Sequence, residues 1–341
     1  MAKSLLTKEE QKKLDSVLRT SGSLKASEAT ESSDMLAKAL ELPLREGVLN
    51  GDITGGVFEP IDLRNSENGT STPEFPLDLL APGTEKDYVA YTIPNHGYIP
   101  QRHVEGDYVM VPTYPIANAI DWNRKFSRDA RWDVVSRAME VFEAGFVKKM
   151  NDDAWFTLIS AAADRNIVVI DSDAAAGQFT KRLVSLMKVV MRRNGGGNST
   201  SINRRKLTDL YISPEAMEDI RNWNVDQIDE TTRRQIFVSE GDEALSRIFG
   251  VNLHVLDELG EGQEYQLFYN SQLGGTLPGS DVELVVGLDL SRRNSFVMPI
   301  VEELQVYDDP SLSRQLRVGV WGTMESGWAV LDGRNCILGS V

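Results

Sequence analysis

The feature that most constrains this chain is a pair of adjoining segments, 85–115 and 127–163. The first carries aromatic and β-branched residues on either side of a polar tip, a pattern typical of a long β-hairpin. An isolated two-stranded ribbon is marginally stable in water, and this segment has little apolar surface with which to cover itself. We therefore expect the hairpin to lie across another subunit, which favours a protein that assembles over one that catalyses a reaction.

The segment 127–163 predicts one continuous amphipathic helix. Its apolar residues recur at steps of three and four, which places their side chains on one face. The stripe consists of Trp132, Val135, Met139, Phe142, Phe146 and Met150. The four central members, from Val135 to Phe146, are the predicted core of this helix. If the helix is unbroken to Ala163, it is roughly 54 Å long at 1.5 Å per residue, which suits a structural spine.

Two residues of this helix carry separate expectations. Ser127 is expected to cap its N-terminus, because a serine hydroxyl can accept a hydrogen bond from the free backbone amides there. Gly145 costs about 1 kcal/mol in the middle of a helix. We expect this glycine to permit the close approach of a neighbouring strand.

Residues 1–84 predict an arm with little core of its own. Residues 7–19 predict a short charged helix, 20–33 have a flexible Ser-, Thr-, Gly- and Glu-rich composition, and 33–40 predict one or two helical turns. Turn-forming residues dominate 47–82. Such a stretch is uncommon inside a compact domain, so we expect the arm to lie over a neighbouring subunit.

The rest of the chain predicts a mixed α+β fold. We expect a strand or hinge at 167–170, strands at 207–212, 251–255, 265–269 and 284–288, a helix at 179–191, and a terminal hairpin at 317–331. Ser213 and Pro214 predict the start of a further helix, because serine caps well and proline suits the first helical position. The run Gly195, Gly196 and Gly197 predicts a mobile loop.

The charge balance argues against nucleic-acid binding as the main role. The chain has 36 Lys and Arg against 51 Asp and Glu, a net charge of -15, whereas strong nucleic-acid binding depends on clustered basic residues. A diffuse acidic balance favours solubility and also suits a container wall that does not adhere to its cargo. No run approaches the ~20 apolar residues of a membrane span, and the start lacks the apolar core of a signal peptide.

Residues that could carry chemistry have structural interpretations that fit better. The glycine run lacks the Gly-Lys-Ser/Thr ending of a phosphate loop. The histidines are His96, His103 and His254; none has the helical i, i+4 spacing of a metal pair, and His254 is expected to be a satisfied structural residue. Acidic pairs at 152–153, 257–258 and 308–309 are expected by chance among 51 acidic residues.

Cys336 is the only cysteine, which excludes an intrachain disulfide and fits a reducing compartment. We interpret it as a small packed residue of a strand rather than a nucleophile. The sequence therefore predicts no catalytic residue, no metal and no cofactor.

The aromatic arms of the hairpin could form a platform for stacked bases. Glu85, Asp87, Glu105 and Asp107 flank them, however, and mixed charge fits protein–protein contact better. The predicted intersubunit contact residues are Lys86, Tyr88, Tyr91, His96, Arg102, His103 and Tyr108.

Three segments, 207–223, 248–255 and 327–332, resemble the strand–helix entry of the axial lobe, the strand after it and the final strand of one known family. That family is the major capsid proteins of tailed bacteriophages, with the Hong Kong 97-type shell fold. The order of arm, extended loop, spine helix, second α+β part and return strand is similar as well. Some members crosslink a Lys to an Asn; we do not carry this over, because Lys86, the only lysine of the loop, lies near its base.

The resemblance implies a division of the chain and a function. The parts would be an N-terminal arm over 1–84, an extended loop hairpin over 85–115, a peripheral domain with the spine helix over 116–175, an axial domain over 176–290, and return strands of the peripheral domain over 291–341. The protein would be a non-enzymatic subunit that assembles, in the bacterial host cytoplasm, into the hexamers and pentamers of an icosahedral virion capsid. The shell would enclose double-stranded DNA without sequence-specific contact; scaffold, portal and decoration proteins would be further partners, and no membrane is implied.

The sequence leaves alternatives open. An encapsulin-like nanocompartment shell, which packages enzymes, would have the same fold. A soluble metal-dependent hydrolase could use one of the acidic pairs. A tail or baseplate structural protein is the third alternative, against which the single spine helix and the long loop argue.

Overall fold

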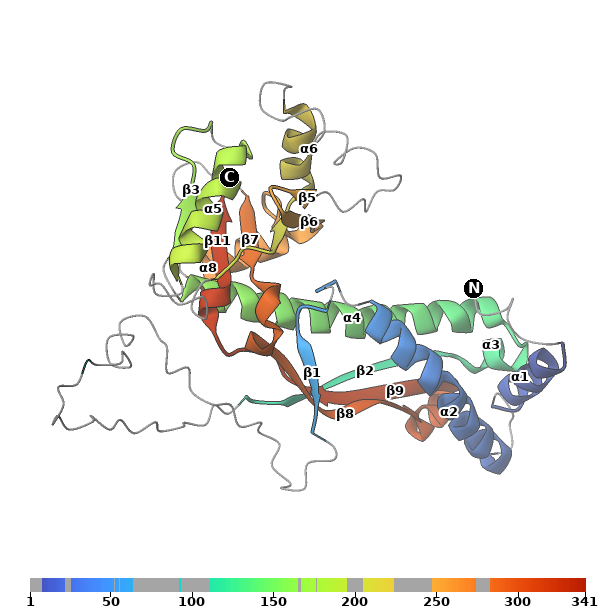
Figure 1. Cartoon of the computed structure of the whole chain (residues 1–341). Helices are drawn as coiled ribbons and strands as arrows, with labels where there is room; N and C mark the ends of the chain where they lie inside the picture. The colour runs from blue at the N-terminus through green and yellow to red at the C-terminus, as the bar shows by residue number, and fades with distance from the viewer. Residues whose placement is uncertain are drawn as a thin grey trace.

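The computed structural model describes residues 8–21, 26–51, 53–54, 56–63, 92, 111–164, 167–175, 177–194, 205–223, 247–273 and 283–341. Two β-sheets lie on different sides of one long helix, α4 (Trp132–Ala163), which runs through the middle of the molecule (Figure 1). The fold is the mixed α+β arrangement that the sequence predicts.

The first sheet is built mainly from long antiparallel strands. Its members are β1 (Glu59–Asp62), β2 (Tyr114–Asn123), β8 (Phe296–Asp308), β9 (Arg317–Ser326) and β10 (Ala329–Val330). Their order is β1-β8-β9-β2, with β10 paired to β8. Strands β2 and β9 pair along their whole length, from Tyr114 opposite Ser326 to Asn123 opposite Arg317. This sheet and α4 enclose much of the larger core.

Helix α4 has 32 residues, about 48 Å at 1.5 Å per residue. Val135, Met139, Phe142 and Phe146 are buried in the core, each 8 % exposed or less. The predicted cap at Ser127 is wrong: this residue lies in a separate short helix, α3 (Arg124–Arg128), and its hydroxyl accepts a hydrogen bond of 2.7 Å from Trp122 Nε1. The Ser127 hydroxyl is therefore bonded to the buried side chain of Trp122 and does not cap α4.

The expected close approach at Gly145 is confirmed. A Cβ atom at this position would lie 2.5 Å from the side-chain nitrogen of Asn118 in β2. That nitrogen donates a hydrogen bond of 3.1 Å to the carbonyl oxygen of Phe142. The missing side chain of Gly145 thus lets a strand residue bond directly to the helix backbone.

Two helices precede the first sheet, and they correct the expected flexible stretch at 20–33. Helix α1 spans Lys8–Ser21 and α2 spans Ala26–Asn50, with Pro43 inside α2. Leu36 and Val48 of α2 are buried in the larger core, and Arg45 forms an ion pair of 2.6 Å with Glu303 of β8. The expectation that the arm has little core of its own is therefore wrong for α2, whose later residues pack against β8 and α4 in the subunit's own core.

The second sheet gathers strands from widely separated parts of the sequence. Its members are β3 (Val168–Ile170), β4 (Asp209–Ile212), β5 (Arg247–Ile248), β6 (Val251–Val255), β7 (Leu284–Leu288) and β11 (Cys336–Ser340), in the order β3-β11-β7-β4-β6-β5. The helices of this region are α5 (Lys181–Asn194), α6 (Pro214–Asn222) and α8 (Glu264–Gln272). We call this sheet with α5, α6 and α8 the second lobe.

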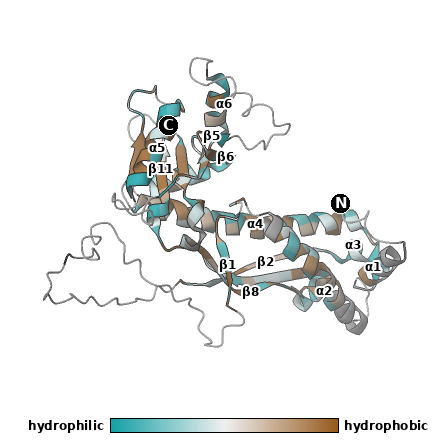
Figure 2. Ribbon diagram, in the orientation of Figure 1, coloured by the Kyte–Doolittle hydropathy of each residue, from teal (hydrophilic) through white to brown (hydrophobic). Residues whose placement is uncertain are grey.

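The two faces of the second sheet pack on different partners. On one face, Tyr211, Val286 and Leu338 join the larger core with α4 and α8. On the other face, alternate residues of the same strands join a separate core with α5 and α6. In Figure 2, β11 is accordingly brown, while α5 carries teal as well.

Several elements of this region match their predictions and two do not. Helix α6 begins at Pro214, and the Ser213 hydroxyl accepts a hydrogen bond of 3.0 Å from Ala216 N as predicted. The strand expected at 265–269 is instead part of α8, because its aromatic residues pack against α4 at helical spacing. The terminal hairpin at 317–331 is also wrong, since β9 pairs with β2 and β8 while β10 pairs with β8.

Four short 3₁₀ helices complete the described elements: η3 (Asp257–Leu259), η4 (Leu290–Ser295), η5 (Pro310–Gln315) and η6 (Gly333–Asn335). The division into a peripheral and an axial domain stays a prediction. Within it, strand β11 pairs with β7 and β3 of the second sheet, although 291–341 was expected as return strands of the peripheral domain. No described helix has the length and apolar character needed to cross a membrane.

Candidate functional site

All the predicted contact residues of the extended loop, and the glycine run predicted as a mobile loop, fall outside the described part of the chain. These are Lys86, Tyr88, Tyr91, His96, Arg102, His103 and Tyr108 of the extended loop, and Gly195, Gly196 and Gly197 of the glycine run. The predicted spine residues are described and lie in the core, where they form a rigid frame rather than an accessible site.

His254 occupies a structural position, as expected. Its Nε2 atom lies 2.9 Å from Asp209 Oδ1, which also accepts a 3.0 Å hydrogen bond from Asn252 Nδ2. Burial raises the pKa of Asp209, but hydrogen bonds from His254, Asn252 and Thr208 outweigh burial and hold this pKa below its usual value. The carboxylate therefore fastens β4 to β6, and the imidazole stacks on Tyr211 at 4.7 Å between ring centroids.

The acidic pair at 152–153 is also engaged in structural bonds. Asp152 forms an ion pair of 3.2 Å with Lys148, and Tyr265 Oη donates a 3.4 Å hydrogen bond to it. Burial raises the pKa of Asp152. Asp153 accepts hydrogen bonds from Tyr114 Oη at 2.9 Å and Lys149 Nζ at 2.6 Å. In the described ranges, no group of three His, Cys, Asp or Glu residues could hold a metal ion.

Cys336 is 1 % exposed and begins β11 opposite Leu288. This placement agrees with the prediction of a small packed residue in a strand. A buried thiol in apolar surroundings is a poor nucleophile, because burial disfavours the reactive thiolate.

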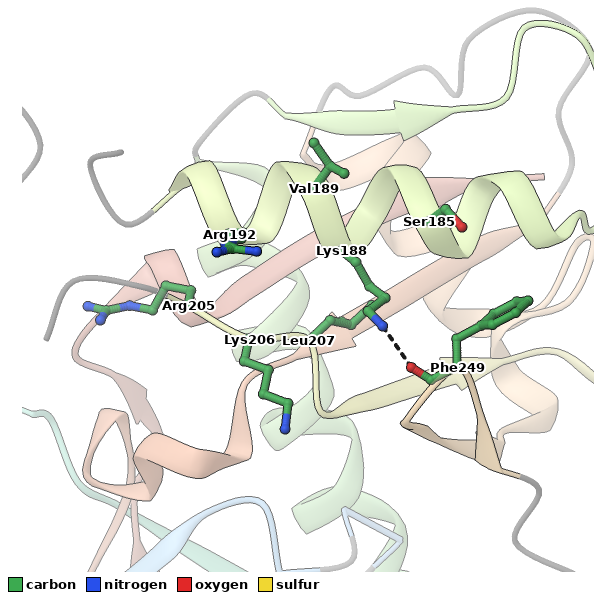
Figure 3. Close-up of a pocket in the computed structure, with 8 residues that line it drawn as sticks. All are labelled: Ser185, Lys188, Val189, Arg192, Arg205, Lys206, Leu207 and Phe249. Carbon is green, nitrogen blue, oxygen red and sulfur yellow. Dashed lines mark hydrogen bonds between the residues drawn. The ribbon is translucent and has the colours of Figure 1, made fainter. Parts of the chain in front are cut away.

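A hollow of about 560 Å³ in the second lobe gathers positive charge (Figure 3). It lies between α5, the segment that leads into β4, and the turn that joins β5 to β6. The lining residues are Ser185, Lys188, Val189, Arg192, Arg205, Lys206, Leu207 and Phe249. Four of these described residues are cationic and none is acidic. We call this site the basic hollow.

Two separate segments bring the cations of the basic hollow together. Lys188 and Arg192 are four residues apart on α5, so they share one helix face. Lys206 follows from the approach to β4, and its backbone amide donates a 2.8 Å hydrogen bond to Asp289. Arg205 is 4 % exposed and its guanidinium is paired with Asp332 at 2.6 Å. The charge that a ligand can meet thus comes mainly from Lys188, Arg192 and Lys206.

The turn beside the hollow has an unusual backbone. Phe249 and Gly250 have φ angles of 51° and 79°, and Ile248 pairs with Val251 across them. Two positive φ angles in a two-residue hairpin loop define a turn that normally takes Asn-Gly. Phenylalanine in this conformation costs of order 1–3 kcal/mol, yet the ring is 47 % exposed. Lys188 Nζ donates a 2.7 Å hydrogen bond to the Phe249 carbonyl and holds the turn against α5 (Figure 3).

Sequence reasoning did not identify the basic hollow. Its cations come from α5 and from the approach to β4, and Phe249 comes from the far side of a long intervening segment, so no local motif joins these residues. The helical spacing of Lys188 and Arg192 and the exposed Phe249 before Gly250 were the available signals. Only the pairing of β4 with β6 shows that these residues meet.

The sequence matches no protein-family model and no curated protein. Comparison with solved structures, in contrast, finds chains of the same fold. A chain of Microbacterium phage Oxtober96 aligns with a TM-score of 0.58 at 11% identity, over 85% of this chain and 90% of that chain. A chain of Mycobacterium phage Adephagia aligns with a TM-score of 0.53 at 14% identity, over 86% and 89%.

A third structure is the capsid asymmetric unit of cyanophage Pam1, with a TM-score of 0.50 at 13% identity over 83% of this chain and 87% of that chain. The chain therefore has the fold of these phage proteins. The resemblance to the Hong Kong 97-type shell fold of tailed-phage major capsid proteins is confirmed at the level of the fold.

Proposed function

We propose that this protein is the major capsid protein of a tailed bacteriophage. It assembles into the hexamers and pentamers of an icosahedral head that encloses double-stranded DNA. The observation that carries the proposal is the fold shared with a phage chain over 85% of this chain and 90% of that chain.

The internal packing supports a structural role, in which the subunit resists mechanical deformation. A helix of 32 residues packs against the first sheet along its N-terminal half and contacts the second sheet near its C-terminal end. Close packing of this kind resists deformation because the interior has low compressibility. Of the acidic pairs that could have served a hydrolase, Asp152 and Asp153 are held in ion pairs and hydrogen bonds within the frame.

The direct test is electron microscopy of the expressed protein together with nuclease protection. Closed icosahedral particles support the shell function, and particles from infected cells that shield double-stranded DNA support the phage head. Closed particles that contain a cargo enzyme and no DNA would show a nanocompartment shell instead. A single monomer peak across the micromolar range, in both low and high salt, would contradict the proposal.

The extended loop supplies a second test. We propose that residues 85–115 contact neighbouring subunits, with Lys86, Tyr88, Tyr91, His96, Arg102, His103 and Tyr108 as contact residues. Replacing 87–109 by a short Gly-Ser linker should leave a soluble chain with a cooperative melt, because both cores described above lie outside this segment. The variant should fail to form closed shells. Particles of normal size would refute the lattice role, and global unfolding would show that the loop belongs to the subunit's own core.

A further inference from the structure

The basic hollow lies at one edge of the second sheet. Strands β4 and β6 are parallel and begin together, with Asp209 opposite Asn252. Lys206 lies shortly before the first residue of β4, and the Phe249 turn immediately precedes β6. The hollow therefore occupies the edge at which these two strands start.

Acidic residues gather at the opposite edge, where β4 and β6 end with Ile212 opposite Val255. Helix α6 begins directly after β4, and η3 follows β6. The two segments meet, because a Cβ atom on Gly260 would lie 2.9 Å from Glu215 Oε2. The exposed carboxylates of this edge are Glu215, Glu218, Asp257 and Glu261. We call them the acidic edge.

The pKa of a buried carboxylate beneath the acidic edge responds to the negative charges of that edge. Glu283 is 5 % exposed and its carboxylate accepts a hydrogen bond from the Ser213 hydroxyl. Burial, and then the charges of Glu215, Asp219 and Glu261, raise the pKa of Glu283. The charges of Glu215, Asp219 and Glu261 therefore lie close enough to Glu283 to disfavour its ionised form.

The second lobe is thus positive at one edge and negative at the other. Two different but complementary surfaces on one chain give a heterologous, head-to-tail contact, which closes into a ring when the rotation between copies allows. We propose that the basic hollow of one subunit binds the acidic edge of a neighbouring copy of this chain. This inference rests on the proposed function, because it assigns one of the contacts by which shell subunits would associate.

A second copy fits the hollow better than nucleic acid does. Phe249 and Val189 are each 47 % exposed beside the cations, and an aromatic anchor with flanking charge is typical of protein interfaces. Asn would adopt this turn at a lower cost than Phe249 does, so we assign a role to the exposed ring itself. The chain as a whole carries a net charge of -15, so the surface outside the hollow repels phosphate.

Charge reversal tests the contact in both directions. Arg192→Glu with Lys206→Glu should abolish assembly by making the hollow negative, and Glu215→Lys with Glu261→Lys should do so by making the edge positive. All four residues are exposed, so both variants should keep the parental melting temperature. The chain with all four substitutions should assemble again. The charge-conserving Arg192→Lys with Lys206→Arg is the matched control and should assemble as the parent does.

Mixing the two reversed variants makes the test independent of shell closure. The negative hollow of the first variant matches the positive edge of the second, and their remaining surfaces also match. Sedimentation of a 1:1 mixture should show larger species than either variant alone, and these should dissociate at high salt because exposed charges are screened. Association in the mixture supports the contact even if the parent forms no closed shell, an outcome that would count against the proposed function alone.

Three outcomes would overturn the inference. One is normal assembly of either reversed variant. Another is a mixture that sediments as its separate components while the parent forms shells. The last is normal assembly of the Arg192→Glu, Lys206→Glu variant with loss of bound double-stranded DNA, which would assign the hollow to nucleic acid.

A substitution at Phe249 separates stability from assembly, which a purely structural role of this residue would not do. Phe249→Asn suits the turn better, so the melting temperature should rise or stay unchanged. Assembly should weaken at the same time, because the exposed ring is lost from the contact. A variant that assembles as well as the parent would show that the ring takes no part.

Discussion

The ring of Tyr211 in β4 meets the ring of Trp155 in α4 edge-on, with 4.7 Å between ring centroids and 72° between ring planes. Trp155 also stacks on Tyr265 of α8 at 5.9 Å. Aromatic pairs of this geometry contribute about 0.5–1.5 kcal/mol each beyond the area that they bury. One tryptophan thus joins the long helix to two elements of the second lobe.

We expect Trp155→Ala to lower the free energy of unfolding by about 3–5 kcal/mol, the range for a buried large aromatic. The second lobe should lose its attachment to α4, so chemical denaturation should shift to lower denaturant concentration. Trp321→Ala is the control, because Trp321 is 39 % exposed on β9. Equal losses for the two variants would contradict the role of Trp155 as the joint.

Phe142→Ala should cost about 3–5 kcal/mol as well, since its ring is fully buried, lies 5.1 Å from the ring of Phe146 and fills the space beside Gly322. Val141 is its neighbour on α4 and is 49 % exposed. Val141→Ala should change stability by less than about 0.5 kcal/mol. Thermal melts followed by circular dichroism distinguish the two; similar melting temperatures would show that the stripe is not the core.

Gly145 and Asn118 should show strong coupling in a double-mutant cycle. Gly145→Ala alone should destabilise the protein, because the new methyl group displaces the Asn118 amide from the Phe142 carbonyl. In an Asn118→Ala background the same change should be neutral or should stabilise by up to about 1 kcal/mol, the helix-propensity gain of alanine over glycine. Additive effects in urea denaturation would exclude this explanation of the glycine.

Glu283 predicts a pH dependence of stability. Its pKa in the folded protein is raised above the ordinary value of 4.5, first by burial. Between 4.5 and the higher folded value the folded state binds more protons than the unfolded state, so this group lowers stability as pH rises through that window. Glutamine cannot ionise, so the stability of Glu283→Gln relative to the parent should grow with pH across the window and then level off.

Free energies of unfolding measured at intervals from pH 4 to pH 8 would test this expectation. Glu261→Gln, at the exposed edge above, controls for the general loss of one negative charge. A relative stability of Glu283→Gln that stays flat or falls with rising pH would show that Glu283 is not held in a low-dielectric site.

The spacing of apolar residues gave correct predictions where one face of an element packs against the core. The stripe from Val135 to Phe146 was recognisable because helical spacing and burial coincide in it. Composition alone failed where packing decides the outcome. Residues 265–269 are rich in aromatic side chains and suggested a strand, but Tyr265 and Tyr269 lie four positions apart on one buried helix face.

The candidate site was beyond sequence reasoning for a topological reason. Lys188, Lys206 and Phe249 meet only because β4 and β6 are parallel neighbours and α5, which packs on one face of the sheet, brings Lys188 to the ends at which these strands start. Strand order is set by long-range pairing, which leaves no fixed spacing in the sequence. The pairing of β10 with β8 escaped prediction likewise, since residues 324–326, which belong to β9, suggested the turn of a hairpin.

The place of β11 has a consequence for the timing of synthesis. This strand lies between β7 and β3, so the second sheet is incomplete until residues 336–340 have left the ribosome. Pairing between segments so distant in sequence must first overcome the entropy of closing long loops, and it is slow compared with local helix formation. Under the proposed shell function, slow completion of this sheet limits the rate at which assembly-competent subunits form, and a slow supply favours growth of particles already begun over the initiation of new ones.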